Sequence, residues 1–424
     1  DKITAVGTSV FTNLDISGDV DVDGTLETDN LTVGGAQGTD GQVLTSTGSG
    51  VGWEDAAGGG VTFKAFGTSS LMVGDDATGT ISAANYNTAL GVDVFAALTS
   101  GDSNVAVGYN AGAGITTGTL NTFIGGLAGD ATTTASDNTG VGAASMSGNT
   151  TGTRNTALGS DSLKVSTEGN DNTAIGKGSL AANTTASNNT AVGKNSLTAN
   201  TTGGQNTAVG QGAGESNTTG VSLAAFGRQA LEANTEGDFN TALGQRALFK
   251  STTSDNNTAV GNQALSENTT GASNTAIGKG ALDANTTADN NTAVGLDALG
   301  ATTTGAVNVA VGTNALLTNI TGTRNSALGV GALQLNTASD NVGIGYHALD
   351  TNAGGSENTA VGAEAMDANT SGSANVAVGY RALDANTTAD NNVAIGQSAL
   401  GANTTGFSNT ALGKDALTAT TTGD

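Results

Sequence analysis

The sequence predicts an all-β fold, a repetitive parallel β-solenoid or β-roll built from 17-residue coils. A glycine recurs every 17 residues from Gly74 to Gly329 and, after the loss of one residue, from Gly345 to Gly413. Gly, Asn and Thr dominate the repeat, and they are poor helix formers. Each copy also keeps Val, Ile or Leu at fixed places, which a disordered chain has no reason to do. A short regular period of this kind is typical of a solenoid.

The repeat N-T-A-V-G-x-x-A-L-x-A-N-T-T-x-x-x is expected to contain two short strands separated by turns. Side chains alternate along a strand, so Thr275 and Ile277 share one face of the first segment and Ala276 takes the other. Both faces are small or apolar, and we expect both to be buried. In the second segment we expect a half-buried strand, with Leu282 inside and Asp283 in water.

The position four residues after each glycine holds Leu, Met or Phe in most coils, so we expect one large side chain per coil to plug a narrow interior. The exceptions are Gly112, Gly129 and Gly214. A thin coil would leave the alanine face of the first strand open. We therefore expect several chains to associate along that face as a homotrimer, although a monomer with another coil cross-section also satisfies the period.

The turns fit this interpretation. The repeating glycine is expected to adopt positive φ, and Asn, Asp and Gly at the second turn suit tight turns. Identical Asn and Thr residues would stack from coil to coil as hydrogen-bonded ladders. The lost residue falls in the turn at 337–341, where we expect a shorter loop and an unbroken stack.

Two domains are expected, small β-rich hairpin modules over 1–60 and the solenoid over 61–424. Residues 1–60 lack the period, and Asp23-Gly24 is a hairpin-type dipeptide. The segment from Gln42 to Trp53 predicts a second hairpin, and Gly58-Gly59-Gly60 predicts a flexible joint.

Composition limits the partners. The net charge is −24, from 37 acidic and 13 basic residues, so no nucleic-acid partner is expected. The absence of cysteine excludes disulfides and thiolate metal sites. No stretch of 18 apolar residues occurs, so no membrane-spanning helix is expected. These features fit an extracellular structure stabilised by hydrogen-bond ladders.

No catalytic, cofactor-binding or metal site is expected. His347 is the only histidine and is expected to be structural or neutral, because a triad or a zinc site would need partners that are absent. Asp283, Asp350, Asp367 and Asp384 each follow the Leu position and should line the solvated strand. The turns Asp289-Asn290-Asn291 and Asp390-Asn391-Asn392 offer oxygen ligands, so calcium is an alternative to simple turn formation.

Receptor-binding residues are not identified by the sequence. The residue before each repeat Asn varies freely, and exposed aromatic residues at the other turn could bind sugars. The variable residues are Leu120, Arg154, Gln205, Phe239, Val307, Arg324 and Glu357 at the first place and Tyr109, Tyr346 and Tyr380 at the second.

Two resemblances follow from short motifs. The core Asn206-Thr207-Ala208-Val209-Gly210, repeated over 71–417, resembles the head repeats of trimeric autotransporter adhesins, which implies a left-handed β-roll of three chains. The segments 13–20 and 41–48 look like sequences of bacteriophage tail fibres, which implies a homotrimeric fibre that contacts other virion fibre or baseplate proteins.

The favoured hypothesis is a non-enzymatic, extracellular phage tail-fibre segment that presents a host-receptor-binding element. The alternative is a bacterial surface adhesin head that binds glycans or matrix. Ice or mineral binding by a Thr ladder ranks third, and an enzyme is the weakest hypothesis.

Overall fold

The computed structural model describes residues 32–33, 36–37, 42–46, 51–55, 63–66, 70–73 and 83–423. The chain divides into two compact units, Asp1–Val61 and Thr62–Asp424.

The described strands of the first unit form two antiparallel pairs, β1 (Thr32–Val33) with β2 (Ala36–Gln37) and β3 (Gln42–Ser46) with β4 (Val51–Asp55). The β3–β4 pair confirms the hairpin predicted from Gln42 to Trp53. The hairpin expected at Asp23-Gly24 and the joint expected at 58–60 lie outside the described residues.

The second unit is a parallel β-solenoid. It begins with β5 (Phe63–Phe66), which pairs antiparallel with β6 (Ser70–Val73). Of the 26 described strands, the last 21, β6 to β26, then pair in parallel, each with the next. Within the described pairings β5 contacts only β6, and β26 only β25, so the ladder is open. The described residues contain no helix.

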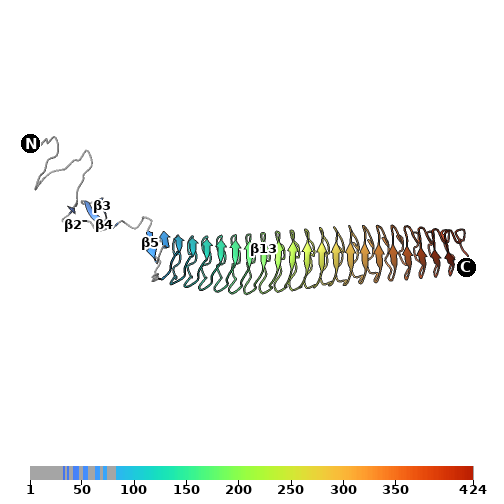
Figure 1. Cartoon of the computed structure of the whole chain (residues 1–424), viewed down its shortest axis with the longest axis horizontal. Helices are drawn as coiled ribbons and strands as arrows, with labels where there is room; N and C mark the ends of the chain where they lie inside the picture. The colour runs from blue at the N-terminus through green and yellow to red at the C-terminus, as the bar shows by residue number, and fades with distance from the viewer. Residues whose placement is uncertain are drawn as a thin grey trace, which may run out of the picture. The chain divides into compact units, whose positions relative to one another are not determined.

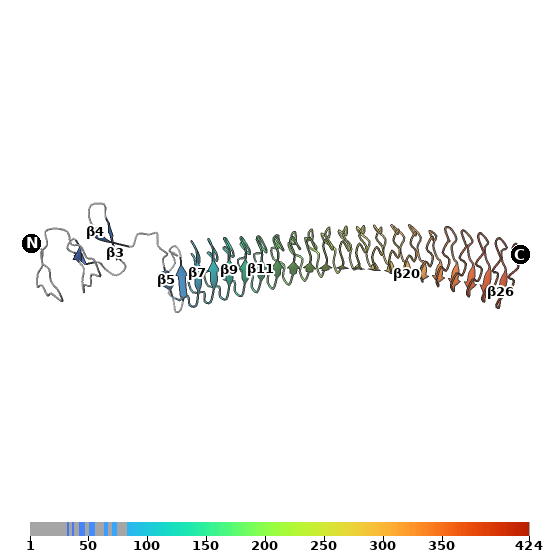
Figure 2. The ribbon, with the colours of Figure 1, turned by 90° about the horizontal axis from the view of Figure 1, so that it is seen from above.

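The strands after β6 are three residues long, and Figure 1 shows them as a single row with one strand per coil. Figure 2 shows the strands changing orientation gradually along that row. They are β7 (Thr88–Leu90), β8 (Val105–Val107), β9 (Thr122–Ile124), β10 (Thr139–Val141), β11 (Thr156–Leu158), β12 (Thr173–Ile175), β13 (Thr190–Val192), β14 (Thr207–Val209), β15 (Ala224–Phe226), β16 (Thr241–Leu243), β17 (Thr258–Val260), β18 (Thr275–Ile277), β19 (Thr292–Val294), β20 (Val309–Val311), β21 (Ser326–Leu328), β22 (Val342–Ile344), β23 (Thr359–Val361), β24 (Val376–Val378), β25 (Val393–Ile395) and β26 (Thr410–Leu412).

The expected second strand does not form. Between Gly278 and Asn285 the backbone makes consecutive turns, with φ of 67° at Gly280 and 53° at Leu282. Two left-handed residues so close together prevent an extended segment, so side chains do not alternate: Ala281 and Leu282 are both fully buried. The half-buried strand was therefore a wrong prediction. The plug itself is confirmed, because Leu282 and its counterparts fill the interior.

The inner and outer faces of the strand are exchanged relative to the expectation. Ala276 is fully buried, whereas Ile277 is 41% exposed and Thr275 is half-buried. The prediction that the alanines face other chains was wrong, because they point into the coil, and within the single chain the opposite face is the exposed one. The physical reason is volume: the strand faces the Leu plug across a narrow interior that is packed to high density, so beside a large plug only a small side chain, usually alanine, fits on the inner side.

Buried asparagines join most coils to their neighbours. The backbone N–H of Asn206 donates to Oδ1 of Asn189 (2.9 Å), and its Nδ2 donates to the carbonyl of Gly220 (2.8 Å). Asn217 donates to the same carbonyl (3.0 Å) and to Oδ1 of Asn200 (2.8 Å). Two asparagine amides, one from the start of the coil and one from near its end, thus converge on one carbonyl and close the coil.

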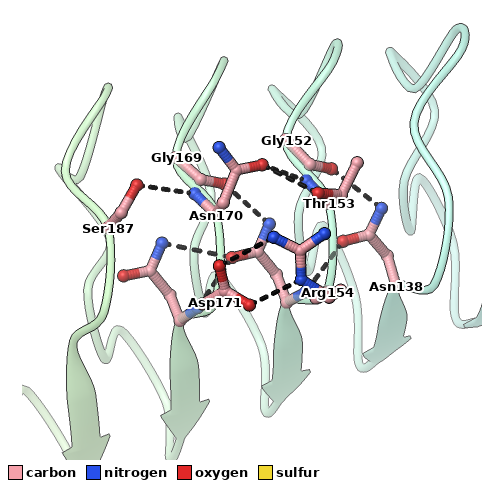
Figure 3. A network of polar contacts seen from close by, with 10 residues as sticks. Asn138, Gly152, Thr153, Arg154, Gly169, Asn170, Asp171 and Ser187 are labelled. Carbon is pink, nitrogen blue, oxygen red and sulfur yellow. Dashed lines mark hydrogen bonds and ion pairs between the residues drawn. The ribbon is translucent and has the colours of Figure 1, made fainter.

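These two rows are named here the first ladder asparagines, which directly precede the strands, and the second ladder asparagines, seven residues after the turn glycine. Figure 3 shows one contact of the first ladder asparagines, in which Nδ2 of Asn138 donates to the carbonyl of Gly152 (2.9 Å). A threonine row runs in parallel, and Oγ1 of Thr201 donates to the carbonyl of Thr218 (3.0 Å). The predicted Asn and Thr ladders are confirmed.

The turn glycine also behaves as predicted. Gly278 has φ of 141°, and a Cβ there would lie 2.3 Å from the carbonyl oxygen of Gly295 in the next coil. The lost residue shortens one loop without breaking the stack, as expected: Ser326 pairs with Val342, and β21 and β22 stay parallel.

The coil of Gly129 has no large plug, and a side chain from the strand fills its interior instead. At Gly129 an added Cβ would lie 2.5 Å from the ring of Phe123, which is fully buried and occupies an alanine position. Gly140, at the alanine position of the next coil, makes further room for the ring, 2.9 Å from an added Cβ. In this coil the ring of Phe123 thus occupies the interior space that a large side chain at position 129 would fill.

This compensation is testable by exchanging the two residues. Phe123→Ala should cost about 3–5 kcal/mol of unfolding free energy, because it leaves a cavity. Adding Gly129→Leu should restore much of that loss, since leucine occupies the same left-handed position at Leu282 (φ 53°). Chemical denaturation measures both, and a double variant no more stable than Phe123→Ala would contradict the account.

The asparagine ladder predicts a second result. Oδ1 of Asn274 accepts the buried backbone N–H of Asn291 (2.9 Å). Asn274→Ala should therefore cost about 1–3 kcal/mol, the penalty for an unpaired buried donor. Thr275→Ala, which removes an outward side chain next to it, should change stability by under about 0.5 kcal/mol. Equal effects in denaturant unfolding would count against the ladder.

Candidate functional site

One extended surface is formed by the outward side chains of strands β6–β26, named here the strand face. Its members are mostly Thr in the first row and Val, Ile or Leu in the second. Leu90, Leu158, Leu243 and Leu328 are about half exposed, at 47–51%. A shallow hollow on β20–β22 is lined by Val309, Val311, Ser326, Ala327, Leu328 and Ile344.

The strand face carries no charge. Strands β6 to β26 contain no Asp, Glu, Lys or Arg, although the chain has a net charge of −24. Within the described coils, the charged side chains stand on the turns instead. An uncharged apolar strip of this length, bordered by polar turns, is characteristic of an interaction surface.

A second candidate is a polar cluster on the turns after β22 to β24, named here the acidic edge: His347, Asp350, Glu364, Asp367, Arg381 and Asp384. Nδ1 of His347 lies 2.7 Å from Oδ2 of Asp350. Nε of Arg381 lies 2.6 Å from Glu364 and 3.8 Å from Asp384. Three successive coils place an aspartate at the same position, and a different residue stands three positions before each: His347 before Asp350, Glu364 before Asp367 and Arg381 before Asp384.

Burial and like charges perturb two of these carboxyls. Burial is the main cause that raises the pKa of Asp367 above its ordinary value, and Asp350 adds to the rise. Burial also raises the pKa of Asp384, against the opposing charge of Arg381. These aspartates lie on turns and are partly buried, which corrects the expectation that they line a solvated strand.

The acidic edge also corrects the expectation that His347 has no partners. A donor atom from each of His347, Asp350 and Asp367 lies within 4.8 Å of the others. One imidazole and two carboxylates match the preferences of Zn²⁺ or Mn²⁺. The signal was available in the sequence, because Asp350 follows His347 by three residues and Asp367 lies one 17-residue coil later. The expectation of no metal site stays a prediction.

The turns considered for calcium have other partners. Oδ1 of Asp289 accepts the backbone N–H of Ala272 (2.7 Å) from the preceding coil. Asn290 takes the left-handed conformation (φ 59°), and Asn291 belongs to the first ladder. Each residue of this Asp-Asn-Asn turn therefore has a structural contact.

The variable residues before the ladder asparagines form an exposed row, which we name the variable row. Leu120, Phe239 and Val307 are 53–58% exposed, and all three have positive φ. Arg154 in this row makes a two-point ion pair with Asp171, at 2.7 and 2.9 Å (Figure 3).

Arg324 and Asp340 repeat that pair further along the stack. The expected aromatic positions are also exposed: Tyr109, Tyr346 and Tyr380 all project from turns. Arg381 lies over the Tyr380 ring, 5.4 Å from its centre, so the acidic edge and Tyr380 form one surface.

Comparison with known protein families, curated proteins and solved structures finds no match. In the described part of the chain, no helix has the length and apolar character needed to cross a membrane.

The pKa of Asp367 predicts a pH dependence. Because its pKa is raised on folding, the ionised carboxylate opposes folding, and stability falls as pH rises through the raised value. Asp367→Asn should therefore raise stability at pH 7, by less than about 1 kcal/mol because the carboxyl is partly exposed. The gain should vanish below about pH 3.8, the ordinary value.

Asp171 is the matched control, in which the pKa shifts in the opposite direction: its hydrogen bond to Arg154 lowers its pKa. Asp171→Asn should lower stability at neutral pH, and this loss should disappear as pH falls through the lowered pKa. Thermal melts from pH 3 to 8 measure both. A gain for Asp171→Asn, or a loss for Asp367→Asn at pH 7, would contradict these assignments.

Proposed function

We propose that this chain is a non-enzymatic structural fibre segment that acts as a spacer of fixed length. The observation that supports it is the unbroken parallel ladder from β6 to β26, in which the same contacts recur in coil after coil. Each added coil lengthens such a stack by roughly 4.8 Å, so about 20 steps give a body about 95 Å long.

The setting we propose is extracellular, as a segment of a bacteriophage tail fibre that holds a host-receptor-binding element away from the particle. The resemblance of segments 13–20 and 41–48 to tail-fibre sequences favours this setting. Homotrimeric assembly and contacts with other virion fibre or baseplate proteins belong to the same proposal.

A second candidate is a bacterial surface adhesin whose lateral surface binds glycans. The observation that favours it is the acidic edge, where the exposed rings of Tyr346 and Tyr380 adjoin the side chains of His347 and Arg381. Neighbouring virion genes would support the fibre, and a secretion anchor encoded in the same gene would support the adhesin.

The spacer function predicts that length follows coil number. Removing residues 189–273, five complete 17-residue coils, joins Asn188 to Asn274 and keeps the ladders in phase. The shortened chain should form rods about 24 Å shorter than the parent, at five steps of roughly 4.8 Å. Negative-stain electron microscopy measures both lengths.

The matched control removes residues 189–268, which is out of phase and joins Asn188 to Thr269. This variant should lose cooperative unfolding. Compact particles from the parent chain, or equal rod lengths for the parent and the in-phase deletion, would overturn the spacer function.

A further inference from the structure

We propose that the strand face is the surface along which copies of this chain pack side by side. This inference rests on the proposed fibre function and names its partner, a second copy of the same chain. It also moves the interface from the alanine face, which the structure buries inside the coil, to the opposite side of the same strands.

The first argument is the apolar surface left open. The third residue of strands β7 to β26 is Val, Ile, Leu or Phe without exception. Exposure is greatest where that residue is leucine, as at Leu158, Leu243 and Leu328. Covering this row would remove apolar surface from water, the dominant favourable term in association.

The second argument is charge. A chain with net charge −24 repels its own copies, and within the described coils this repulsion acts between the turns, where the charged side chains stand. The strand face is the exception, because no charged residue occurs in β6 to β26. Two copies can therefore approach along this side without burying an unpaired charge.

The area of the strand face and its coil spacing also suit a second copy. The strand face is about 95 Å long and, across its two side-chain rows, about 10 Å wide. An area on the order of 950 Å² per copy compares well with the ~800 Å² per partner of a stable interface. A second copy has the same coil spacing and the same length, so rows of Val, Ile and Thr can interdigitate throughout, as between two stacked sheets.

The test uses the full chain and three evenly spaced leucines. Leu158, Leu243 and Leu328 lie five coils apart on the strand face, and we replace all three with Glu. The control replaces Leu120, Phe239 and Val307, which are at least as exposed but lie in the variable row, with Glu. Sedimentation equilibrium gives the mass of each.

The wild-type chain and the control should have two or three times the monomer mass of 40.8 kDa, and the strand-face variant should have the monomer mass. A monomeric wild type, or a strand-face variant that stays associated, would overturn the inference. Rod length by electron microscopy separates the two proposals. Monomeric rods would overturn only the strand-face contact, whereas particles that are not rods would overturn the fibre function.

A second measurement covers the case in which the triple variant fails to fold. The chain has no cysteine, so Leu243→Cys introduces a single thiol on the strand face, and Val307→Cys introduces one in the variable row. Under mild oxidation Leu243→Cys should form a covalent dimer much faster than Val307→Cys, because the proposed packing brings the Leu243 positions of two copies together. Equal rates would overturn the inference.

Discussion

The convergence of two asparagine amides on one backbone carbonyl, which recurs in most coils, is the contact on which the rest of the structure depends. In the coil of Gly210, Asn206 and Asn217 both donate to the carbonyl of Gly220, and Asn206 also accepts the N–H of the next coil. Buried amides must be paired, so the contact fixes both the closure of a coil and its position on its neighbour. The same contact can therefore recur along the stack, beside the core of alanines and plug residues.

This closure explains why small residues stand on the inner side of the strand and larger apolar residues on the outer side. The ladder asparagines and the plug occupy the interior, which leaves room only for alanine on the inner side of the strand. Where the plug is lost at Gly129, Phe123 fills the space from an alanine position. Larger apolar residues such as Ile277 are placed outside. The strand face thus follows directly from how narrow the coil is, and it is the surface along which we propose that copies of the chain pack.

The sequence predicted the period, the positive φ of Gly278, the plug at Leu282 and the asparagine ladders, because each leaves an identical residue at a fixed spacing. It did not predict which side of the strand faces inward. Alternation shows only that Ala276 and Ile277 point in opposite directions, and the choice depends on interior volume. The cluster of His347, Asp350 and Asp367 was also missed, because the 17-residue period was not applied to Asp367, which the winding of the chain brings beside the other two.

The most direct test is a cryo-electron microscopy reconstruction of the purified chain at a resolution that shows side chains. The account predicts density for one short strand per coil at a spacing of about 4.8 Å. Alanine should point into the coil and Val, Ile or Leu out of it, with two asparagine side chains reaching one carbonyl. A reconstruction with alanine on the outer side of the strands, or without the paired asparagines, would contradict it.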